Sequence, residues 1–349
     1  MINLHVNDIA LSVPEGKTIL EACKDAGISI PAFCYDERLQ AEASCRICVV
    51  EVAGTAKLWP ACATFVTEGM RIETHSPRVV GLRKQLLETM LSNHDIACLQ
   101  CEKAGACLLQ DYAYEYDVDI EKMTGRKKAA DYTVANKFFS IDQSKCILCG
   151  KCVRTCSHLQ TNSVWAMANR GFETEVTTPF GIDMEDAGCV HCGNCVSICP
   201  VGALMPKSEH KFRAWETHRV RTTCGYCGVG CQMDLMVKDD KVVGVQPAPG
   251  KLNEGLLCVK GKFAFDFINH PSRLKEPLVR AEDGSLRPAS WDEALGIVAD
   301  KIKEIKQSSG PDAIMGLASA RASIEDNYLF AKFMRAAVGT NNVDHCARL

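Results

Sequence analysis

The residues of this sequence most able to do chemistry are its cysteines. The chain has 349 residues, of which 21 are cysteines, and all but Cys23 and Cys346 fall into short groups. Thiols form disulfides in oxidising compartments, whereas thiolates in reduced compartments bind soft metals. The first residues, MINLHVNDIALSV, lack the basic segment and apolar run of an export signal. We therefore expect a cytoplasmic protein whose cysteines bind metal.

The most specific groups lie in the middle of the chain. Two runs with C-x2-C-x2-C-x3-C spacing carry Cys146, Cys149, Cys152 and Cys156, and then Cys189, Cys192, Cys195 and Cys199, followed by Pro200. In bacterial ferredoxins with two [4Fe–4S] clusters, the fourth cysteine of each such run binds the other cluster. We therefore expect a Cys146 set (Cys146, Cys149, Cys152 and Cys199) and a Cys189 set (Cys189, Cys192, Cys195 and Cys156). Ser157 replaces the proline of the first run, which shapes a turn and binds no iron.

Two further groups precede this pair. The Cys34 set, with C-x10-C-x2-C-x13-C spacing, is Cys34, Cys45, Cys48 and Cys62. Four thiolates on loops can hold a [2Fe–2S] cluster, although the first gap is longer than in plant-type ferredoxins. The His94 set, with H-x3-C-x2-C-x5-C spacing, is His94, Cys98, Cys101 and Cys107. It predicts a [4Fe–4S] cluster with one imidazole ligand, and zinc is the alternative metal for both sets.

A last group follows the ferredoxin pair. This Cys224 set, with C-x2-C-x3-C-x26-C spacing, is Cys224, Cys227, Cys231 and Cys258. Gly225, Gly228 and Gly230 lie between its first three cysteines and allow the backbone to wrap closely around a cluster. The spacing indicates a metal site, and a fourth [4Fe–4S] cluster is the expected occupant. Cys23 falls within a predicted helix, where a buried core cysteine is the simplest interpretation.

The elements that must position these groups predict an α+β protein of several domains. In residues 1–78, apolar residues alternate on both sides of Asn7-Asp8, which indicates a hairpin, and Thr18 and Glu21 form a capping-box pattern before a short helix that ends at Gly27. A hairpin, a helix and then a cysteine-rich loop suit a β-grasp [2Fe–2S] ferredoxin domain. Residues 79–118 show helical spacing of apolar residues and carry the His94 set.

The rest of the chain divides in the same way. Residues 121–131 are expected to form a polar linker, 138–210 the two-[4Fe–4S] ferredoxin domain, and 217–275 the module of the Cys224 set. From residue 276 to 349 an αβ pattern begins, with helices expected over 291–307 and 325–339 and a strand over 313–319. Net charge is −3 and no basic patch is interleaved with aromatic residues, so we expect no nucleic-acid partner. No apolar run approaches the roughly 20 residues of a membrane span, so we expect no direct membrane insertion.

The order of modules resembles the first part of the alpha subunit of cytoplasmic, metal-dependent formate dehydrogenases. The stretches CGYCGVGC (224–231), NEGLLCVKGKFAFDFINHPSRLKEPL (253–278), SWDEAL (290–295) and GTNNVDHCAR (339–348) are similar to the start of the catalytic domain that binds molybdenum or tungsten bis(pterin guanine dinucleotide). The first half also resembles the G subunit of complex I and the N-terminal region of [FeFe]-hydrogenases. No hydrogen-cluster motif follows residue 210, and the complex I subunit does not usually carry the intact eight-cysteine repeat.

The resemblance implies one [2Fe–2S] cluster, four [4Fe–4S] clusters and, in the full-length protein, the metal–pterin cofactor. Lys260, in the CVKG motif, would contact that cofactor and relay electrons between it and the Cys224 set. Electrons from formate would then reach the Cys34 set and leave to a flavin- and NAD(P)-binding diaphorase-type subunit, a ferredoxin or a hydrogenase subunit. The G subunit of a complex I-like NADH dehydrogenase, a stand-alone electron carrier and a zinc-stapled scaffold are the alternatives.

In this family the NVDHCAR motif is followed by one apolar residue and then by the metal-binding selenocysteine or cysteine. Here Leu349 follows Arg348 and is the last residue given. We expect the sequence to be the N-terminal part of a longer protein, interrupted at a selenocysteine codon. We also expect this polypeptide alone to be inactive toward formate.

Overall fold

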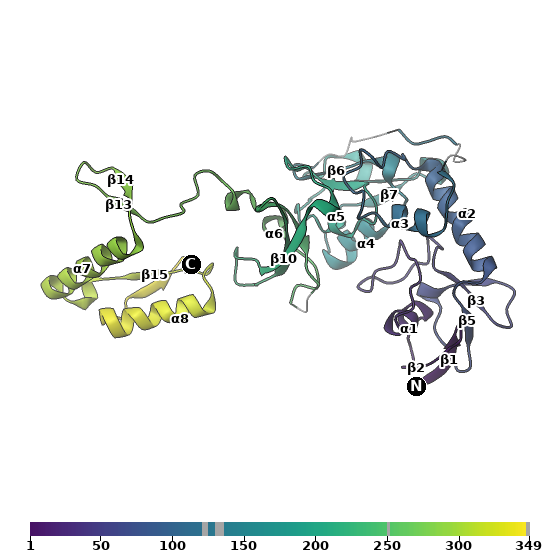
Figure 1. Ribbon diagram of the computed structural model, residues 1–349, viewed down its shortest axis with the longest axis horizontal. Helices are drawn as coiled ribbons and strands as arrows, with labels where there is room; N and C mark the ends of the chain where they lie inside the picture. Colours follow the sequence, from purple (N-terminus) through teal and green to yellow (C-terminus); the bar gives the residue numbers. More distant parts are fainter. Residues whose placement is uncertain (121–124, 130–135, 250–251, 347–349) are drawn as a thin grey trace. The chain divides into compact units, whose positions relative to one another are not determined.

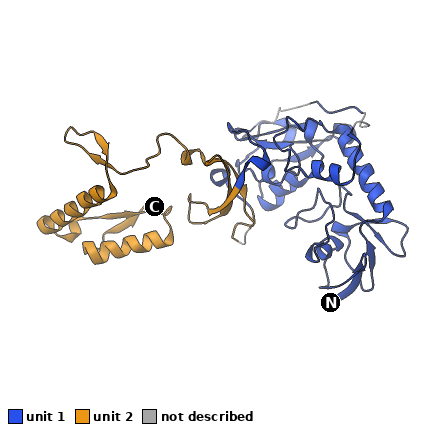
Figure 2. Cartoon of the chain, in the orientation of Figure 1, with its two compact units in different colours: residues 1–218, 256–262 blue, residues 219–255, 263–349 orange. Residues whose placement is uncertain are grey.

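The computed structural model describes residues 1–120, 125–129, 136–249 and 252–346, and the chain forms two compact units. Unit 1 holds residues 1–218 and 256–262, and unit 2 holds residues 219–255 and 263–349 (Figure 2). The predicted module 217–275 is therefore divided between the units. Parts of the expected linker 121–131 and the last residues of the GTNNVDHCAR motif lie outside the described residues. None of the helices in the described ranges is long and apolar enough to cross a membrane.

Unit 1 begins with a five-stranded sheet (Figure 1). Its strands, in the order β2-β1-β5-β3-β4, are β1 (Ile2–Val6), β2 (Ile9–Val13), β3 (Val49–Val52), β4 (Leu58–Pro60) and β5 (Arg71–Glu73). β1 and β2 form the expected antiparallel hairpin, β1 runs parallel to β5, and β3 is antiparallel to β4 and β5. The turn of the hairpin places Asn7 at a φ of 54°, a left-handed conformation that asparagine tolerates better than most residues.

Helix α1 (Ile19–Asp25) packs on this sheet. The expected capping box is present, because the Thr18 side chain accepts from the Glu21 amide and the Glu21 carboxylate accepts from the Thr18 amide at 2.8 Å. Ile19 and Cys23 of the helix are fully buried against Leu4 and Ile72 of the sheet. This core anchors the loops before β3 and after β4, where the Cys34 set lies. The short 3₁₀ helix η1 (Ala61–Ala63) carries Cys62.

Two helices follow the sheet. α2 (Pro77–Asn93) begins after Ser76, whose side chain caps the Val79 amide, and it ends at His94. α3 (Leu108–Glu115) begins directly after Cys107. The predicted helical region of residues 79–118 is thus two helices, with the members of the His94 set at the end of one, in the loop between them, and at the start of the other.

The ferredoxin-like part of unit 1 consists of short elements. Two antiparallel pairs join β6 (Phe139–Ile141) to β9 (Leu204–Pro206) and β7 (Ala166–Ala168) to β8 (Glu175–Thr177). Helices α4 (Lys151–Arg154) and α5 (Asn194–Ile198) occupy equivalent places in the two runs, and η4 (Thr155–Leu159) extends α4 as a π-helical turn. Gly150 and Gly193 precede these helices at φ values of 69° and 71°, which glycine adopts without strain. The described residues of this part also contain the 3₁₀ turns η3 (Gln143–Lys145), η5 (Gly171–Glu173), η6 (Pro179–Gly181) and η7 (Ala214–Glu216).

Unit 2 contains a three-stranded sheet and the start of an αβ layer. The sheet has the order β10 (His218–Thr223), β11 (Gln232–Lys238) and β12 (Lys241–Pro247), and α6 (Val259–Phe263) begins in the residues assigned to unit 1. After η8 (Asp266–Ile268), β13 (Leu278–Arg280) and β14 (Leu286–Pro288) form a hairpin.

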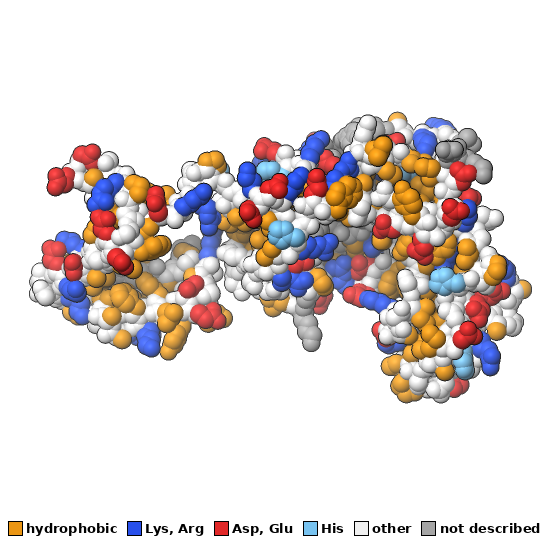
Figure 3. Space-filling model, viewed as in Figure 1, with side chains coloured by type: hydrophobic (Ala, Val, Ile, Leu, Met, Phe, Trp, Pro, Cys, Tyr) orange, Lys and Arg blue, Asp and Glu red, His pale blue; other side chains and the backbone are white. Residues whose placement is uncertain are grey.

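The αβ layer follows that hairpin. Its elements are α7 (Trp291–Ser309), η9 (Pro311–Ala313), β15 (Gly316–Ala318), α8 (Ile324–Phe333), the π-helical turn η10 (Met334–Val338) and β16 (Val343–His345), and β15 is parallel to β16. The first expected helix is confirmed within two residues. The second is confirmed as α8 continued by the π-helical turn η10, which together span residues 324–338. The strand is shorter than the expected 313–319 because Pro311 and Ala313 form a 3₁₀ turn. Hydrophobic side chains stand at the surface of the part that holds α7 and α8 (Figure 3).

Candidate iron–sulfur sites

The four thiols of the Cys34 set lie in mutual contact. Hydrogen bonds from Cys45 and then Cys62 hold the pKa of the Cys34 thiol far below its ordinary value. The bond from Cys62 likewise lowers the pKa of Cys48, and the donors Cys45 and Cys62 have raised pKa values. Cys34, Cys48 and Cys62 are each about 1% exposed. Four adjacent thiols, of which three are buried and Cys45 is half-buried, fit a [2Fe–2S] cluster, whose irons take four thiolates.

His94 offers an unsatisfied nitrogen. The side chain is buried, its ring hydrogen-bonds the backbone of Lys145, and burial lowers its pKa to about 4, so the ring is neutral near pH 7. Within the described parts of the chain, Nδ1 is buried and has no hydrogen-bond partner. A neutral imidazole with one nitrogen held and the other available is how histidine binds metals. The ring therefore fits the predicted ligand role.

The cysteines of the His94 set are close to one another and partly shielded. Burial raises the pKa of Cys98, and the negative charge of Cys101 raises it further. Burial also raises the pKa of Cys107. Cys101 packs directly on Gly202, where an added Cβ would stand 2.8 Å from the Cys101 sulfur. The amide of Leu108, next to Cys107, donates to the carbonyl of Pro200 at 3.0 Å. The loop of this set is thus fixed against the end of the second ferredoxin run.

The ferredoxin cysteines group across the two runs. Burial raises the pKa of Cys146 to about 11 and that of Cys149 to about 12, and in both cases the charge of Cys199 adds to the effect. In the other group, burial raises the pKa of Cys195, and the charges of Cys192 and Cys156 add to it. Cys199 thus lies near Cys146 and Cys149, and Cys156 lies near Cys195. The assignment of these cysteines to two [4Fe–4S] clusters remains a prediction.

The surroundings of these two sets suit clusters. The amides of Leu148 and His191 each donate to the sulfur two residues before them, at 3.4 Å from Cys146 and Cys189. Amide donors of this kind stabilise thiolates, which are the form that binds iron. One cavity in unit 1 is lined by all four members of the Cys189 set together with apolar side chains, among them Phe139, Trp165 and Met184.

The Cys224 set is divided by the unit boundary. In unit 2, the Cys224 amide donates to the Cys231 carbonyl at 2.8 Å, and Gly230, at a φ of 67°, donates to the Cys227 carbonyl. Cys258 and Lys260 belong to unit 1, where both side chains are exposed. The Cys224 set and the relay role of Lys260 remain predictions. In the described residues, no group of three or more His, Cys, Asp or Glu side chains has the arrangement of a site for a single metal ion.

Several polar residues around these sets were not expected from the sequence. Asn194 donates to the Leu257 carbonyl and accepts from the Leu257 amide, both at 3.0 Å, and so holds the residue before Cys258 against α5. The amide of Asn136 lies 3.6 Å from the Cys189 sulfur, and Lys262 is buried near Cys195, with its pKa lowered by burial to about 7. Single polar residues outside a repeated spacing give no signal in the sequence.

Family models match the chain along its length. They are described as a 2Fe-2S iron-sulfur cluster binding domain (residues 1–77), the NADH-ubiquinone oxidoreductase-G iron-sulfur binding region (83–121), a 4Fe-4S dicluster domain (145–203), a molybdopterin oxidoreductase Fe4S4 domain (217–270) and a molybdopterin oxidoreductase domain (273–349). The predicted series of iron–sulfur domains followed by the start of a molybdopterin domain is thereby confirmed.

Curated relatives match nearly all of the chain. The NADPH-Fe(3+) oxidoreductase subunit alpha of Geobacter sulfurreducens is 34% identical over 100% of this chain and 40% of its own length. An NADH-quinone oxidoreductase G subunit of Rhizobium meliloti is 36% identical over 100% of this chain and 40% of its own. A putative formate dehydrogenase of Staphylococcus aureus is 30% identical over 96% of this chain and 38% of its own. The chain thus spans about 40% of the relatives' length.

A solved structure of an NAD+-reducing [NiFe]-hydrogenase in the H2-reduced state is also similar. It aligns with a TM-score of 0.55 and 28% sequence identity, covering 60% of this chain and 88% of that chain.

Proposed function

We propose that this chain of iron–sulfur and molybdopterin oxidoreductase domains is the electron-transfer part of a formate dehydrogenase alpha subunit. It would conduct electrons, in the cytoplasm, between a molybdenum or tungsten bis(pterin guanine dinucleotide) site and a partner that binds flavin and NAD(P). The observation that carries the proposal is the grouping of cysteines and His94 into separate sets, joined by direct contacts within unit 1.

These contacts link neighbouring sets. Arg154, between Cys152 and Cys156, bonds to the carbonyl of Cys34. The amide of Asp95, beside His94, donates to Ser144 near the Cys146 set, and Asn194 holds Leu257 beside the Cys189 set. Because electron tunnelling falls steeply with distance, a conducting protein must hold its clusters on adjoining loops. In unit 1, the hydrogen bonds described above hold the loops of neighbouring sets next to one another.

The order of the domains along the chain suggests the direction in which electrons would pass between the clusters. Formate oxidation yields carbon dioxide, one proton and two electrons, and the metal–pterin group would accept those electrons. Lys260 lies in α6 two residues after Cys258, and its cationic side chain would sit where charge moves between that group and the Cys224 set. The Cys34 set lies at the other end of the chain and would deliver electrons to the partner.

A second candidate is an electron-transfer subunit of an NADH dehydrogenase, like the G subunit of complex I. The match over residues 83–121 and the 36% identity to the Rhizobium meliloti protein favour it. Both candidates use the same clusters, and they differ in the substrate that reduces them.

The decisive experiment is anaerobic purification of the full-length gene product together with its neighbouring subunits. We expect about 18 irons per chain, from one [2Fe–2S] and four [4Fe–4S] clusters, and reduction of their electron paramagnetic resonance signals by formate. Residues 1–349 alone should bind the iron and show no formate-dependent reduction. Reduction by NADH but never by formate would replace the proposal with the second candidate, and zinc in place of iron would exclude both.

A further inference from the structure

Arg154 occupies an unusual position in unit 1. It is the last residue of α4, between Cys152 of the Cys146 set and Cys156 of the Cys189 set. Its side chain reaches the loop that begins at Cys34, and it is only 4% exposed. The sequence separation of 120 residues between Arg154 and Cys34 means that the fold, not the local chain, brings them together.

The guanidinium makes three interactions with the Cys34 loop. Its two terminal nitrogens donate to the carbonyl of Gln40, at 2.9 Å, and to the carbonyl of Cys34. Its Nε lies 3.1 Å from Oε2 of Glu42, in an ion pair whose carboxylate is half-exposed. Burying a guanidinium is costly unless its hydrogen bonds and charge are matched. Here two of its partners are main-chain oxygens of the loop that presents a predicted iron ligand.

We propose that Arg154 is a positioning residue that fixes the Cys34 loop against the Cys146 set and sets electron exchange between the two. This inference rests on the proposed function, since it needs clusters at both sets. A planar, forked cation can hold two carbonyls in one orientation, which lysine cannot do. Its charge also lies beside a set of thiolates that becomes more negative on reduction, and therefore stabilises the reduced form.

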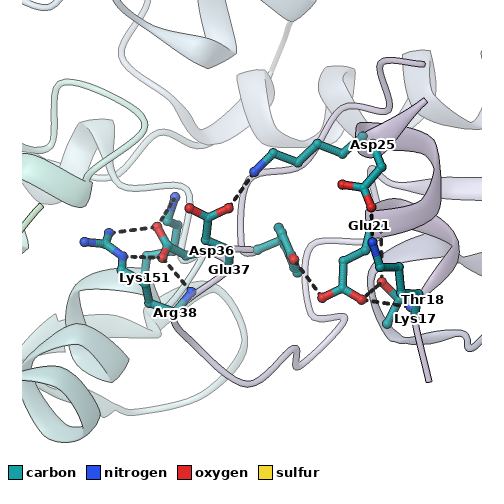
Figure 4. A network of polar contacts seen from close by, with 10 residues as sticks. Lys17, Thr18, Glu21, Asp25, Asp36, Glu37, Arg38 and Lys151 are labelled. Carbon is teal, nitrogen blue, oxygen red and sulfur yellow. Dashed lines mark hydrogen bonds and ion pairs between the residues drawn. The ribbon is translucent and has the colours of Figure 1, made fainter. Parts of the chain in front are cut away.

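A second ion pair at the same contact provides a matched control. Lys151, at the start of α4, lies 3.9 Å from the carboxylate of Asp36, and Arg38 hydrogen-bonds the same carboxylate at 2.8 Å (Figure 4). Burial by itself would raise the pKa of Asp36, but the bonds from Arg38 outweigh it and lower the pKa. Because Arg38 keeps Asp36 paired, loss of Lys151 removes a cation from the contact without freeing the backbone of Cys34.

The test compares the wild-type complex with R154Q, R154K and K151Q. Iron and sulfide content is measured first, then the midpoint potential of the [2Fe–2S] signal by redox titration, and then its rate of equilibration with the [4Fe–4S] signals by freeze-quench spectroscopy. In R154Q we expect full iron content, a lower potential and slower equilibration. R154K should recover the potential and only part of the rate, and K151Q should match the wild type.

The possible results distinguish a failure of the Arg154 inference from a failure of the proposed function. An R154Q protein with intact clusters, wild-type potential and wild-type rate would overturn the inference and leave the proposed function standing. A wild-type protein without iron would instead defeat the proposed function. If R154Q does not assemble, R154K decides, because an iron-loaded R154K protein with a wild-type rate contradicts a role for the forked contact. Equal changes in K151Q and R154Q would show that the positive charge at this contact, and not the forked bond of Arg154 to the Cys34 loop, sets the potential and the rate, which also contradicts it.

Discussion

At the scale of single residues, His94 has the clearest features of a metal ligand. Its ring is buried, neutral and fixed by the Lys145 backbone, and its Nδ1 lacks a hydrogen-bond partner in the described residues. Histidine ligands raise cluster potentials because imidazole is neutral and thiolate is not. We expect H94C to retain the cluster at a lower midpoint potential and H94A to lose it. Redox titration of the purified protein measures both, and unchanged potential in H94C would contradict the ligand role.

Asn136 supports a different prediction. Its side-chain amide nitrogen lies 3.6 Å from the Cys189 sulfur and 2.7 Å from Nδ1 of His191. Hydrogen bonds to cluster sulfurs raise the reduction potential by stabilising the added negative charge. N136L should therefore lower the potential of the Cys189 cluster and leave the [2Fe–2S] potential unchanged. N169G, which loses a bond to the Glu175 carboxylate outside the cavity of the Cys189 set, is the control and should change neither. A shift common to N136L and N169G would mean that the effect is a general loosening of the domain.

At the scale of elements, the loop after Pro200 limits what can stand beside Cys101. An added Cβ at Gly202 would lie 2.8 Å from the Cys101 sulfur and 3.2 Å from Cβ of Lys103. G202A should therefore displace Cys101 and cost the protein the His94 cluster. The control is G81A in helix α2, where nothing lies within 4 Å and alanine favours the helix by about 1 kcal/mol. Iron analysis should show a loss of about four irons in G202A alone. Full iron content in G202A would contradict this account.

The capping box of α1 gives a second prediction at this scale. Glu21 accepts from Thr18 and Tyr35, and although burial by itself would raise its pKa, these bonds lower it. A carboxyl whose pKa is lower in the folded protein than in the unfolded chain stabilises the fold at pH values above its unfolded pKa. This stabilisation is lost as the pH falls through the pKa of the folded protein. E21Q should flatten that acid dependence below about pH 4.5, and T18A should cost about 1 kcal/mol near neutral pH. Both are measured as the urea concentration at which the [2Fe–2S] absorbance disappears. An unaltered pH dependence in E21Q would contradict the sign.

The sequence predicts the elements and sets that repeat a known spacing. The hairpin around Asn7, the capping box at Thr18 and the helices of unit 2 follow from local patterns. The crossed ferredoxin sets come from cysteine spacing and remain a prediction. The β7–β8 pair was not predicted, because its three-residue strands carry no readable alternation. The contacts of Arg154 with Cys34 and of Asn194 with Leu257 were also not predicted, since they join residues 120 and 63 positions apart.

At the scale of the whole molecule, Asn194 contributes two hydrogen bonds that hold the segment 256–262 within unit 1. Asn194 is 2% exposed and bonds to both backbone groups of Leu257, next to Cys258. N194A should leave two buried backbone groups unpaired, which costs about 1–3 kcal/mol each. Hydrogen–deuterium exchange should then accelerate at Leu257 and its neighbours and remain unchanged in the β1–β2 hairpin. Uniform acceleration across unit 1 would instead mean that N194A destabilises the entire unit.

The crossed arrangement of the ferredoxin cysteines also has a consequence for how the protein is made. In the predicted ligand sets, Cys146, Cys149 and Cys152 share a cluster with Cys199, and Cys156 belongs with the second run. Neither site has its four thiols until most of the second run has been synthesised, and the site begun first is completed last, at Cys199. The two clusters should therefore be inserted late and close together in time. A chain released before the second run would carry unprotected thiols, so we expect oxygen exposure and iron supply during translation, as well as folding, to limit its yield.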